Sequence, residues 1–309
     1  MEKIKSINNQ KILKIDDESF EFVKTRTYTP ISVYKGENTF LRIGTGEELR
    51  KELELHKELL KCKFPIAEIL KEGTYEGQFF YIEKALGTMP LGSVFTNECK
   101  ENGKISDNSF LPFLKLSEQF AKAQLLTASK SGNFEKDAYT GFHMDYVVEE
   151  LPKLKDELIR AFQKMNDTTS IFPVVITHGD CNPYNLFDKG IIDIENNFHA
   201  HAGYDLISNI YSTYCFPKNG DYENKRRYEF TSAQIAEYMQ RIDKVYTDAG
   251  LPKLSVYQDD FMFARIVWAT ARMQYTPKLQ KWRYDLLEKT IANYIEDKPV
   301  IDVLMNFPV

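Results

Sequence analysis

The chain has 309 residues, of which 43% are hydrophobic and 28% are charged, and its formal net charge is −5. This length supplies ample core for one large domain or two modest ones, and the ordinary balance of apolar and charged residues excludes disordered and fibrous proteins. The slightly negative charge disfavours a nucleic-acid partner that requires a globally basic surface, although it leaves a local basic patch open.

The sequence has no apolar segment of signal-peptide type at its N-terminus and no apolar run long enough to span a bilayer. Its four cysteines are far apart and lack the paired spacing of metal ligands, which is typical of reduced thiols; they are Cys62, Cys99, Cys181 and Cys215. These features predict a cytoplasmic protein with no membrane and no nucleic-acid partner. They leave the oligomeric state open.

Segments rich in β-formers, separated by turn signals, occupy most of the first eighty-odd residues: FEFVKTRT, ISVYKG, NTFLRIG and QFFYIEKAL. One helix interrupts them, from Gly46 to Cys62. After Gly87, apolar periodicity predicts helices over residues 111–129, 144–165, 232–249, 259–275 and 280–295. A small sheet-rich lobe followed by a larger helical lobe suggests two lobes with a cleft between them, divided between residues 1–86 and 87–309.

The early helix carries one carboxylate in an unexpected position. At 3.6 residues per turn its leucines form one broad face, and Glu52 falls within that face. A carboxylate on a buried face is costly unless it has a partner, and the preceding strand offers the cation Arg42. Whether this pair is functional or purely structural, or whether Glu52 reaches solvent at the lobe edge, is open at this point.

The stretch THGDCNPYNLFDKGIIDIEN, residues 177–196, has the pattern of a hairpin with polar groups around it. If Asp188-Lys189-Gly190 is a three-residue loop with Gly190 at positive φ, Asn185 faces Asp193, with Cβ atoms about 5 Å apart. Two such oxygen ligands suit Mg²⁺. Phe187 shares their face as an apolar floor, and Asp180 precedes the hairpin as a potential base.

A zinc hydrolase is an alternative for the same stretch. His178 and Asp180, together with His199 and His201, could supply zinc ligands. Their spacing differs from that of helical His-rich zinc motifs, which disfavours this hypothesis. Cys181 has no evident partner base and is expected to be a bystander.

His178-Gly179-Asp180, four further residues, Asn185 and then Ile192-Asp193 resemble the signature HGDxxxxN…ID of the aminoglycoside phosphotransferase and choline kinase superfamily. Four ordered segments share the resemblance. TFLRIG is similar to the strand with the phosphate-binding cation, LRKELELHKELLKCKFPIAEIL to the helix that follows, FFYIEKALG to the hinge, and HAGYDLI to the segment after the metal-binding Asp. The resemblance covers residues 20 to 215.

The resemblance implies an α+β, bilobal, protein-kinase-like fold. A small antiparallel-sheet lobe with one helix, residues 1–86, would bind the nucleotide, and a larger, mainly helical lobe, residues 87–309, would hold the catalytic and substrate sites. Asp180 would be the catalytic base, and Asn185 and Asp193 would hold Mg²⁺ on the phosphates of ATP or GTP. The other implied roles are phosphate contact by Arg42 oriented by Glu52, adenine contact by the backbone of Glu83, Lys84 and Ala85 and by the ring of Phe187, and structural support by His178 and Asp205.

The sequence departs from the family pattern at four places. The loop near KTRTYTPIS lacks the glycines that usually cover the nucleotide, and the phosphate-binding cation is Arg42 where many relatives have Lys. The hairpin between Asn185 and Asp193 is short. Ala123-Gln124 stands where Leu-His is usual.

Aromatic and acidic residues after Ser208 suggest a cationic acceptor, which would bind through carboxylate pairing and cation–π contacts. They are Tyr211, Tyr214, Phe261, Trp268, Tyr275, Asp259 and Asp260. The alternative is that the aromatics are core and that the two acids begin a helix.

The sequence therefore predicts a kinase that phosphorylates a hydroxyl group of a small molecule, such as an amino sugar, an aminoglycoside-like compound or an amino alcohol such as choline. Two rivals remain. One is a non-catalytic nucleotide-binding protein, motivated by the glycine-poor loop. The other is a protein kinase, which is disfavoured because Asp193 is followed by Ile-Glu and no familiar activation segment is present.

Overall fold

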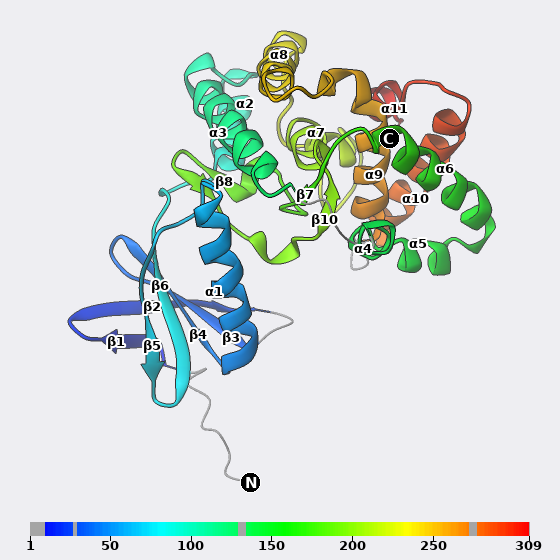
Figure 1. The fold of residues 1–309 in the computed structure, drawn as a ribbon. Helices are drawn as coiled ribbons and strands as arrows, with labels where there is room; N and C mark the ends of the chain where they lie inside the picture. The colour runs from blue at the N-terminus through cyan, green and yellow to red at the C-terminus, as the bar shows by residue number, and fades with distance from the viewer. Residues whose placement is uncertain (1–9, 27–29, 129–133, 272–276, 309) are drawn as a thin grey trace. The chain divides into compact units, whose positions relative to one another are not determined.

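In the computed structural model of the protein, the described residues are 10–26, 30–128, 134–271 and 277–308. They divide into two compact units. One comprises the residues up to Thr88 together with Lys189–Ile192, and the other comprises Met89–Asp188 and the residues from Asp193 onward. In Figure 1 the first unit runs mostly from blue to cyan and the second from cyan through green to red.

The first unit contains a six-stranded sheet in the order β1-β2-β3-β4-β6-β5, in which every neighbouring pair is antiparallel. The strands are β1 (Ile12–Ile15), β2 (Glu18–Thr25), β3 (Ile31–Lys35), β4 (Thr39–Gly44), β5 (Ile69–Tyr75) and β6 (Gln78–Lys84). The predicted antiparallel sheet is confirmed. The two edge strands were not predicted, and β5 is largely exposed, so its sequence lacks the apolar alternation that marks a strand.

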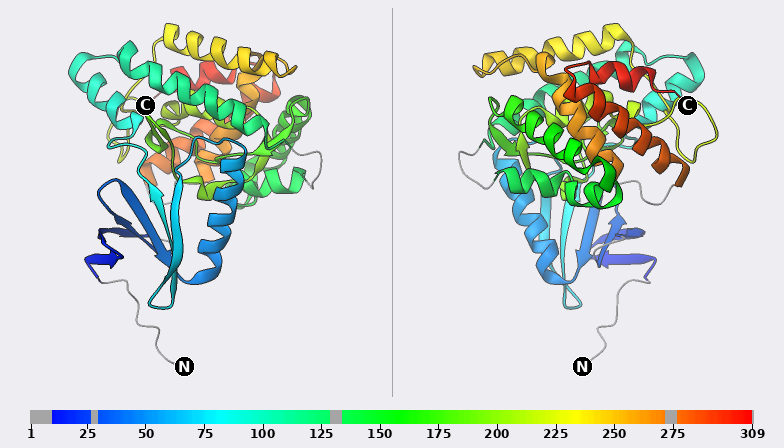
Figure 2. Two further views of the ribbon diagram at one scale, coloured as in Figure 1. Left: turned by 60° about the vertical axis from the view of Figure 1, so that its left-hand side comes forward. Right: turned by 90° about the vertical axis from the view of Figure 1, so that its right-hand side faces the viewer.

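Helix α1 (Gly46–Lys61) lies along one face of this sheet (Figures 1 and 2). It buries Leu49, Leu53, His56 and Leu59, and its leucines pack with Phe79 and Tyr81 of β6. The opposite face carries a separate core that includes Phe20, Tyr34 and Phe80. Successive residues of β6 thus serve two cores, as the period of two of a strand requires.

The second unit is mainly helical, as predicted. Its helices are α2 (Leu91–Asn102), α3 (Asp107–Leu125), α4 (Phe134–Gly141), α5 (Met144–Glu150), α6 (Lys155–Thr169), α7 (Tyr204–Tyr211), α8 (Ser232–Asp248), α9 (Gln258–Ala271), α10 (Pro277–Ile295) and α11 (Val300–Asn306). Helix α9 is buried from Asp260 to its end and packs against α5, α6, α7, α10 and α11. A helix buried on all sides is the centre of its unit, and Figure 2 shows α9 (orange) among these neighbours.

Two predicted helices differ from the observed ones. Residues 144–165 form two helices, α5 and α6, because Pro152 lacks an amide hydrogen and disfavours a helical conformation in the residue before it. Helix α3 begins four residues earlier than predicted, where the Ser106 hydroxyl accepts a hydrogen bond from the Ser109 amide. The predicted helix ends at Ser129 and Tyr275 lie outside the described residues.

Short strands hold the polar loops of the second unit. β7 (Val174–Ile176) and β10 (His199–His201) form an antiparallel pair, which continues in a hydrogen bond from the Thr177 amide to the Phe198 carbonyl. β8 (Leu186–Phe187) is followed by the turn Asp188–Lys189 and then by β9 (Gly190–Ile191), whose residues belong to the first unit. None of the helices in the described ranges is both long enough and apolar enough to cross a membrane.

Acid should destabilise the second unit through His201. This side chain is buried, its Nδ1 lies 2.8 Å from the Thr169 hydroxyl, and burial lowers its pKa from 6.5 to about 4. Between these pH values the unfolded chain binds more protons than the folded one, so stability is full above pH 6.5 and falls as the pH decreases towards 4. At about 1.4 kcal/mol per pH unit, the loss amounts to about 3 kcal/mol. Replacing His201 by Gln should remove this part of the acid sensitivity in urea unfolding measured across the window.

The matched control is His199→Gln, in the same strand but exposed, which should retain the acid sensitivity of the unmodified protein. If the two variants lose stability equally on acidification, His201 is not the group responsible.

Candidate functional site

The loop that follows β7 is fixed by a buried carboxylate. Asp205, at the start of α7, accepts hydrogen bonds from the amides of His178 at 2.7 Å and Gly179 at 3.1 Å. Gly179 has φ +83°, and a Cβ there would lie 2.0 Å from the Asn196 carbonyl oxygen, so only glycine fits. The loop is therefore held in one conformation immediately before Asp180.

Gln124, at the end of α3, supports the same carboxylate. Its side-chain nitrogen donates to Asp205 at 2.7 Å and to the Ile176 carbonyl at 3.2 Å. Burial raises the pKa of Asp205, and the neighbouring His178 and the hydrogen bonds from the loop amides and Gln124 oppose this increase. Gln124, which replaces the usual His at this position, therefore still donates a hydrogen bond to Asp205.

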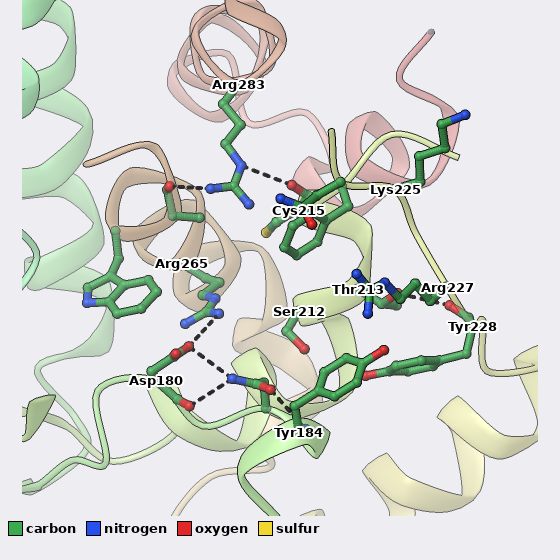
Figure 3. A pocket seen from close by; sticks show the side chains of 15 residues that line it. Asp180, Tyr184, Ser212, Thr213, Cys215, Lys225, Arg227, Tyr228, Arg265 and Arg283 are labelled. Atoms are coloured by element: carbon green, nitrogen blue, oxygen red, sulfur yellow. Dashed lines mark hydrogen bonds and ion pairs between the residues drawn. The ribbon is translucent and has the colours of Figure 1, made fainter. Parts of the chain in front are cut away.

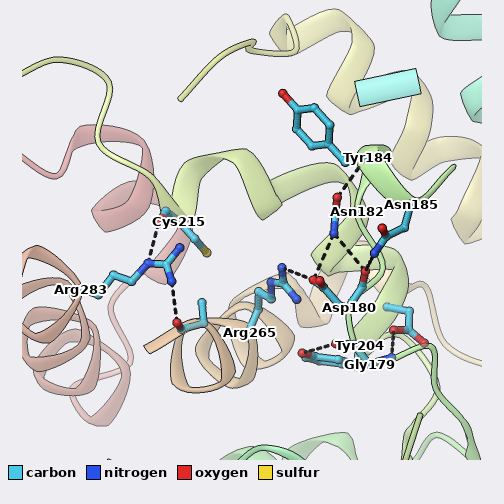
Figure 4. Close-up of polar contacts among 11 residues, drawn as sticks. Gly179, Asp180, Asn182, Tyr184, Asn185, Tyr204, Cys215, Arg265 and Arg283 are labelled. Carbon is cyan, nitrogen blue, oxygen red and sulfur yellow. Dashed lines mark hydrogen bonds and ion pairs between the residues drawn. The ribbon is translucent and has the colours of Figure 1, made fainter. Parts of the chain in front are cut away.

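Asp180, the acid of this loop, is half-buried. Its Oδ1 accepts hydrogen bonds from Arg265 Nη2 at 3.0 Å and from Asn182 Nδ2 at 3.1 Å (Figure 4). No hydrogen bond to Oδ2 is found within the described part of the chain, and the side chain is 28% exposed. One oxygen is therefore held in place while the other is available to a ligand.

Arg265 is a buried partner of Asp180 that was not predicted from the sequence. It lies in α9, is 5% exposed, and its guanidinium is 4.4 Å from the Trp268 ring centroid. Burial disfavours its charged form, but Asp180 and the neighbouring Tyr204 outweigh burial and raise its pKa. Arg265 thus stays charged and fixes the orientation of the Asp180 carboxylate.

The two predicted metal ligands lie in two 3₁₀ turns. Asn185 ends the turn Pro183–Asn185, and its Nδ2 donates to the Asp180 carbonyl at 2.9 Å, while no hydrogen bond to its Oδ1 is found among the described residues. Asp193 precedes the turn Ile194–Asn196 in the left-handed conformation, with φ 60°. No bond of its side chain is found among the described residues. Aspartate is one of the few residues besides glycine that adopt this conformation at low cost, and Asp16 and Asp297 share it.

The predicted geometry of the hairpin is wrong in two respects. The turn has two residues instead of three, and Gly190 is not at positive φ. Gly190 is needed for a different reason, because a Cβ there would lie 2.5 Å from the Pro65 carbonyl oxygen. Asn185 and Asp193 lie outside the strands β8 and β9, so they are not cross-strand partners.

The zinc alternative is also wrong for the described residues, where no group of three or more His, Cys, Asp or Glu side chains could hold a metal ion. His199 is exposed, and the His201 ring is bonded to Thr169. Cys181 is fully buried, and burial raises the pKa of its thiol, which keeps it protonated and unreactive. A pair of ligands such as Asn185 and Asp193 is not excluded by this result.

In the first unit, the predicted ion pair of Arg42 and Glu52 is present, with Arg42 Nη1 3.3 Å from Glu52 Oε1. Glu52 also binds Arg26, with distances of 2.5 and 3.1 Å, and accepts a hydrogen bond from Tyr81 at 2.6 Å. Arg42 in turn donates to the Glu83 carboxylate at 2.9 Å. Burial opposes ionisation of Glu52, but the charges of Arg42 and Arg26 lower its pKa overall. Arg26 was not predicted.

Two of the backbone amides that were predicted to contact adenine already form hydrogen bonds within the protein. The Lys84 amide donates to the Glu68 carbonyl and the Ala85 amide to the Asn38 carbonyl, both at 2.9 Å. A nucleotide at this segment would therefore use other backbone groups or replace these bonds. Phe187 lies in β8 of the second unit and is half-buried. In the glycine-poor loop, residues 27–29 lie outside the described part of the chain.

Removing the Glu52 carboxylate should strongly destabilise the first unit. Its side chain is 13% exposed and contacts Arg26 and Arg42, which are buried to a similar degree. Glu52→Ala would therefore leave these two cations without the carboxylate that they share. Breaking a buried ion pair from one side costs about 3 kcal/mol or more. Urea unfolding of this variant should show that loss, whereas Glu58→Ala, on the exposed face of the same helix, should change stability by less than about 0.5 kcal/mol. Equal stabilities of the two variants would contradict the central role of Glu52.

A cavity of about 470 Å³ opens beside Asp180 in the second unit (Figure 3). Its walls include Asp180 and Tyr184 from the loop region, Arg265 from α9 and Arg283 from α10. A cavity of this volume accommodates a small metabolite or part of a larger ligand. The carboxylate of Asp180 is thus placed where it can reach a bound small molecule.

Comparison with known proteins identifies the fold. No protein-family model and no curated protein sequence matches the chain. Among solved structures, a choline/ethanolamine kinase family protein from Mesorhizobium loti is similar, with a TM-score of 0.56 and 15% identity over 93% of this chain and 92% of that one.

Two aminoglycoside phosphotransferases match with lower scores. The type VIII aminoglycoside-3'-phosphotransferase has a TM-score of 0.46 and 15% identity over 78% of this chain and 93% of its own. The enzyme APH(3'')-Id from Streptomyces rimosus, in complex with ADP and streptomycin, has a TM-score of 0.46 and 13% identity over 78% of this chain and 92% of its own. On the strength of the higher-scoring match, the chain has the kinase-like fold of the choline/ethanolamine kinase family protein.

Proposed function

We propose that the protein is a phosphotransferase that uses Mg²⁺ and ATP, or GTP, to phosphorylate a hydroxyl group of a small molecule. The observation that carries the proposal is Asp180, which lines a cavity of metabolite size with one carboxylate oxygen fixed and the other available. The kinase-like fold supports it, because a loop with a carboxylate of this kind suits phosphoryl transfer.

Asp180 would act as the base that receives the hydroxyl proton. A general base must lie within hydrogen-bond reach of the proton it accepts, in a fixed orientation. Arg265 and Asn182 supply the orientation through Oδ1, and the loop behind Asp180 is held by Asp205. Phosphoryl transfer demands little covalent chemistry from the protein, so positioning of the acceptor hydroxyl is the main contribution of these residues.

Asn185 and Asp193 would hold Mg²⁺. Their donor atoms are an amide oxygen and a carboxylate, the hard oxygen ligands that Mg²⁺ prefers. The Asn185 amide is already oriented by its bond to the Asp180 carbonyl, and no competing bond of the Asp193 side chain is found among the described residues. Bound Mg²⁺ would supply charge neutralisation at the nucleotide phosphates.

The nucleotide contacts proposed for the first unit centre on Arg42. Its guanidinium would contact a phosphate, oriented by Glu52 and Glu83. Backbone groups of Glu83, Lys84 and Ala85 would meet the base, and Phe187 would supply an apolar contact. We place the reaction in the cytoplasm, because all four cysteines are free thiols, as is typical of a reducing compartment.

The test is product formation. The protein is incubated with ATP labelled in the γ-phosphoryl group, with Mg²⁺ and a panel of amino sugars, aminoglycosides, choline and other hydroxylated metabolites. We expect label to enter an acceptor, and we expect this transfer to stop when Mg²⁺ is chelated. Nucleotide binding in calorimetry with no labelled product from any acceptor would instead support a non-catalytic nucleotide-binding protein.

A further inference from the structure

The cavity beside Asp180 is lined by far more positive than negative charge. Asp180 is the single carboxylate among its described lining residues, whereas Arg227, Arg265, Arg283 and Lys225 are cations. The whole chain, by contrast, has a net charge of −5. Positive charge is therefore concentrated at this cavity against the overall trend, which favours an anionic ligand.

Arg283 is a buried cation that forms no ion pair with any described residue. It is 3% exposed, donates Nε to the Cys215 carbonyl at 3.1 Å and Nη1 to the Ala269 carbonyl at 2.7 Å, and has no carboxylate partner in the described part of the chain. Burial lowers its pKa to about 10. Cys215 and the Asp180 carboxylate oppose this decrease and the nearby Arg265 adds to it, and Arg283 still carries its charge at neutral pH. A buried charge of this kind is costly unless an anion compensates it.

The third guanidinium nitrogen of Arg283 is available to a ligand. Its Nη2 donates no hydrogen bond among the described residues, because the two carbonyls engage Nε and Nη1. Arg227 lines the same cavity and is exposed, with no ion pair or hydrogen bond of its side chain found in the described ranges. Lys225 contributes less, because its ammonium points away from the other labelled side chains in Figure 3.

The two acids that suggested a cationic acceptor, Asp259 and Asp260, form hydrogen bonds with other parts of the protein. Asp259 accepts hydrogen bonds from the amides of Val300 and Ile301 at the start of α11, and Asp260 is bonded to Tyr294. Neither acid lines the cavity. The expectation that these acids bind a cationic substrate is therefore wrong.

Two of the four aromatic side chains that line the cavity are covered by the protein's own arginines, and the other two are Tyr184 and Tyr228. The Trp268 ring is covered by Arg265 at 4.4 Å, and the Phe216 ring by Arg283 at 4.8 Å. Of the other aromatics considered for cation binding, Tyr214 is covered by Arg226 at 4.5 Å and Phe261 is buried against Phe172. Tyr275 lies outside the described residues. Trp268, Phe216 and Tyr214 thus already make cation–π contacts with the protein's own arginines.

We infer that the acceptor carries an oxyanion, a carboxylate or a phosphate group, which Arg283 and Arg227 bind while the acceptor hydroxyl lies at Asp180. The inference rests on the proposed kinase function and specifies its substrate class. The available Nη2 of Arg283 and the guanidinium of Arg227 can donate charge-assisted hydrogen bonds to either kind of oxyanion. The same cations would repel an aminoglycoside or choline from this cavity.

The experiment compares acceptors that share a skeleton and differ in charge. Sets built on a triol, a pentose and a hexose each contain the neutral polyol or sugar, the corresponding acid, the phosphate ester and the amine. Phosphorylated product is measured with Mg²⁺ and ATP, and kcat/KM is compared within each set. We expect the acid or the phosphate ester to exceed the neutral and aminated members by about tenfold to a hundredfold, as charge-assisted hydrogen bonds predict. The better of the two anionic members identifies the oxyanion.

Three variants test whether the cations of the cavity cause the preference for an anionic acceptor. Arg283→Gln and Arg227→Gln should each raise the KM for the anionic acceptor by about tenfold or more while the KM for ATP stays unchanged. Arg283 also bonds two buried carbonyls, so Arg227→Gln, an exposed position, keeps the test valid if Arg283→Gln does not fold. The matched control is Arg160→Gln, an exposed arginine of α6, which should change neither constant.

Two outcomes would overturn the inference and leave the kinase function standing. One is a neutral or aminated acceptor preferred in every set, with transfer that depends on Asp180. The other is a rise in the KM for ATP equal to that for the acceptor in Arg227→Gln, which would assign these cations to the nucleotide. If no acceptor gives a phosphorylated product, the result counts against the kinase function itself, and the inference about the acceptor fails with it.

Discussion

Asp180→Asn should lower the rate of phosphoryl transfer by roughly 10²- to 10⁴-fold, the usual contribution of a general base. The amide is nearly the same size as the carboxylate and can still accept the hydrogen bond from Arg265 through its oxygen, but it cannot take up the proton of an acceptor hydroxyl. Binding of Mg²⁺ and ATP should remain within a few-fold of the unmodified protein, because Asp180 is not one of the proposed metal ligands. The rate is measured as labelled product, and binding is measured by calorimetry.

The matched control for this variant is Asp188→Asn, in the exposed turn between β8 and β9. It makes the same chemical change close in the sequence and should leave turnover unchanged. If Asp180→Asn turns over at nearly the unmodified rate, another group takes the proton and Asp180 loses its assignment. If it loses nucleotide binding as well as turnover, its role lies in the fold of the loop.

The elements that periodicity predicted well are those with one buried and one exposed face. α1 was predicted in nearly its full length, because its leucines recur at the helical period and its opposite face is charged. α7 was not predicted, although Asp205, Ser208 and Asn209 recur at the helical period, because its eight residues are fewer than the window over which periodicity identifies a helix. β5 was not predicted because most of this edge strand is exposed, so its apolar residues do not alternate with polar ones.

The sequence predicted the site residues that lie close together in the chain, but it did not predict Arg265, which comes from a distant helix. The polar loop from His178 to Asp193 was predicted because its residues follow one another in the sequence. Arg265 reaches Asp180 from 85 positions away, and only the packing of α9 brings the two together. Its signal was nevertheless present, as a lone cation in the apolar segment FMFARIVWATA. The test that identified Glu52, a charge on a buried face that needs a partner, would have identified Arg265 as well.

Asp193→Ala should weaken the Mg²⁺-dependent binding of ATP by about tenfold or more, the scale of effect seen when a metal site is perturbed. The change removes one of the two proposed oxygen ligands and a negative charge. It also places alanine in the left-handed conformation, with φ 60°, which costs about 1 kcal/mol of stability. Calorimetric titration with ATP at several Mg²⁺ concentrations separates the two effects, because only the loss of a ligand changes the dependence on Mg²⁺.

Asp297→Ala is the matched control, because Asp297 is also an aspartate in the left-handed conformation, with φ 57°, and its side chain is 85% exposed. It should lose a similar amount of stability without any change in ATP affinity. Asp193→Asn completes the set, since asparagine tolerates the left-handed conformation and keeps one oxygen, so its affinity should fall between those of the unmodified protein and Asp193→Ala. If Asp193→Ala binds ATP with unchanged affinity at every Mg²⁺ concentration, Asp193 is not a metal ligand, and its backbone conformation then serves only the turn that follows β9.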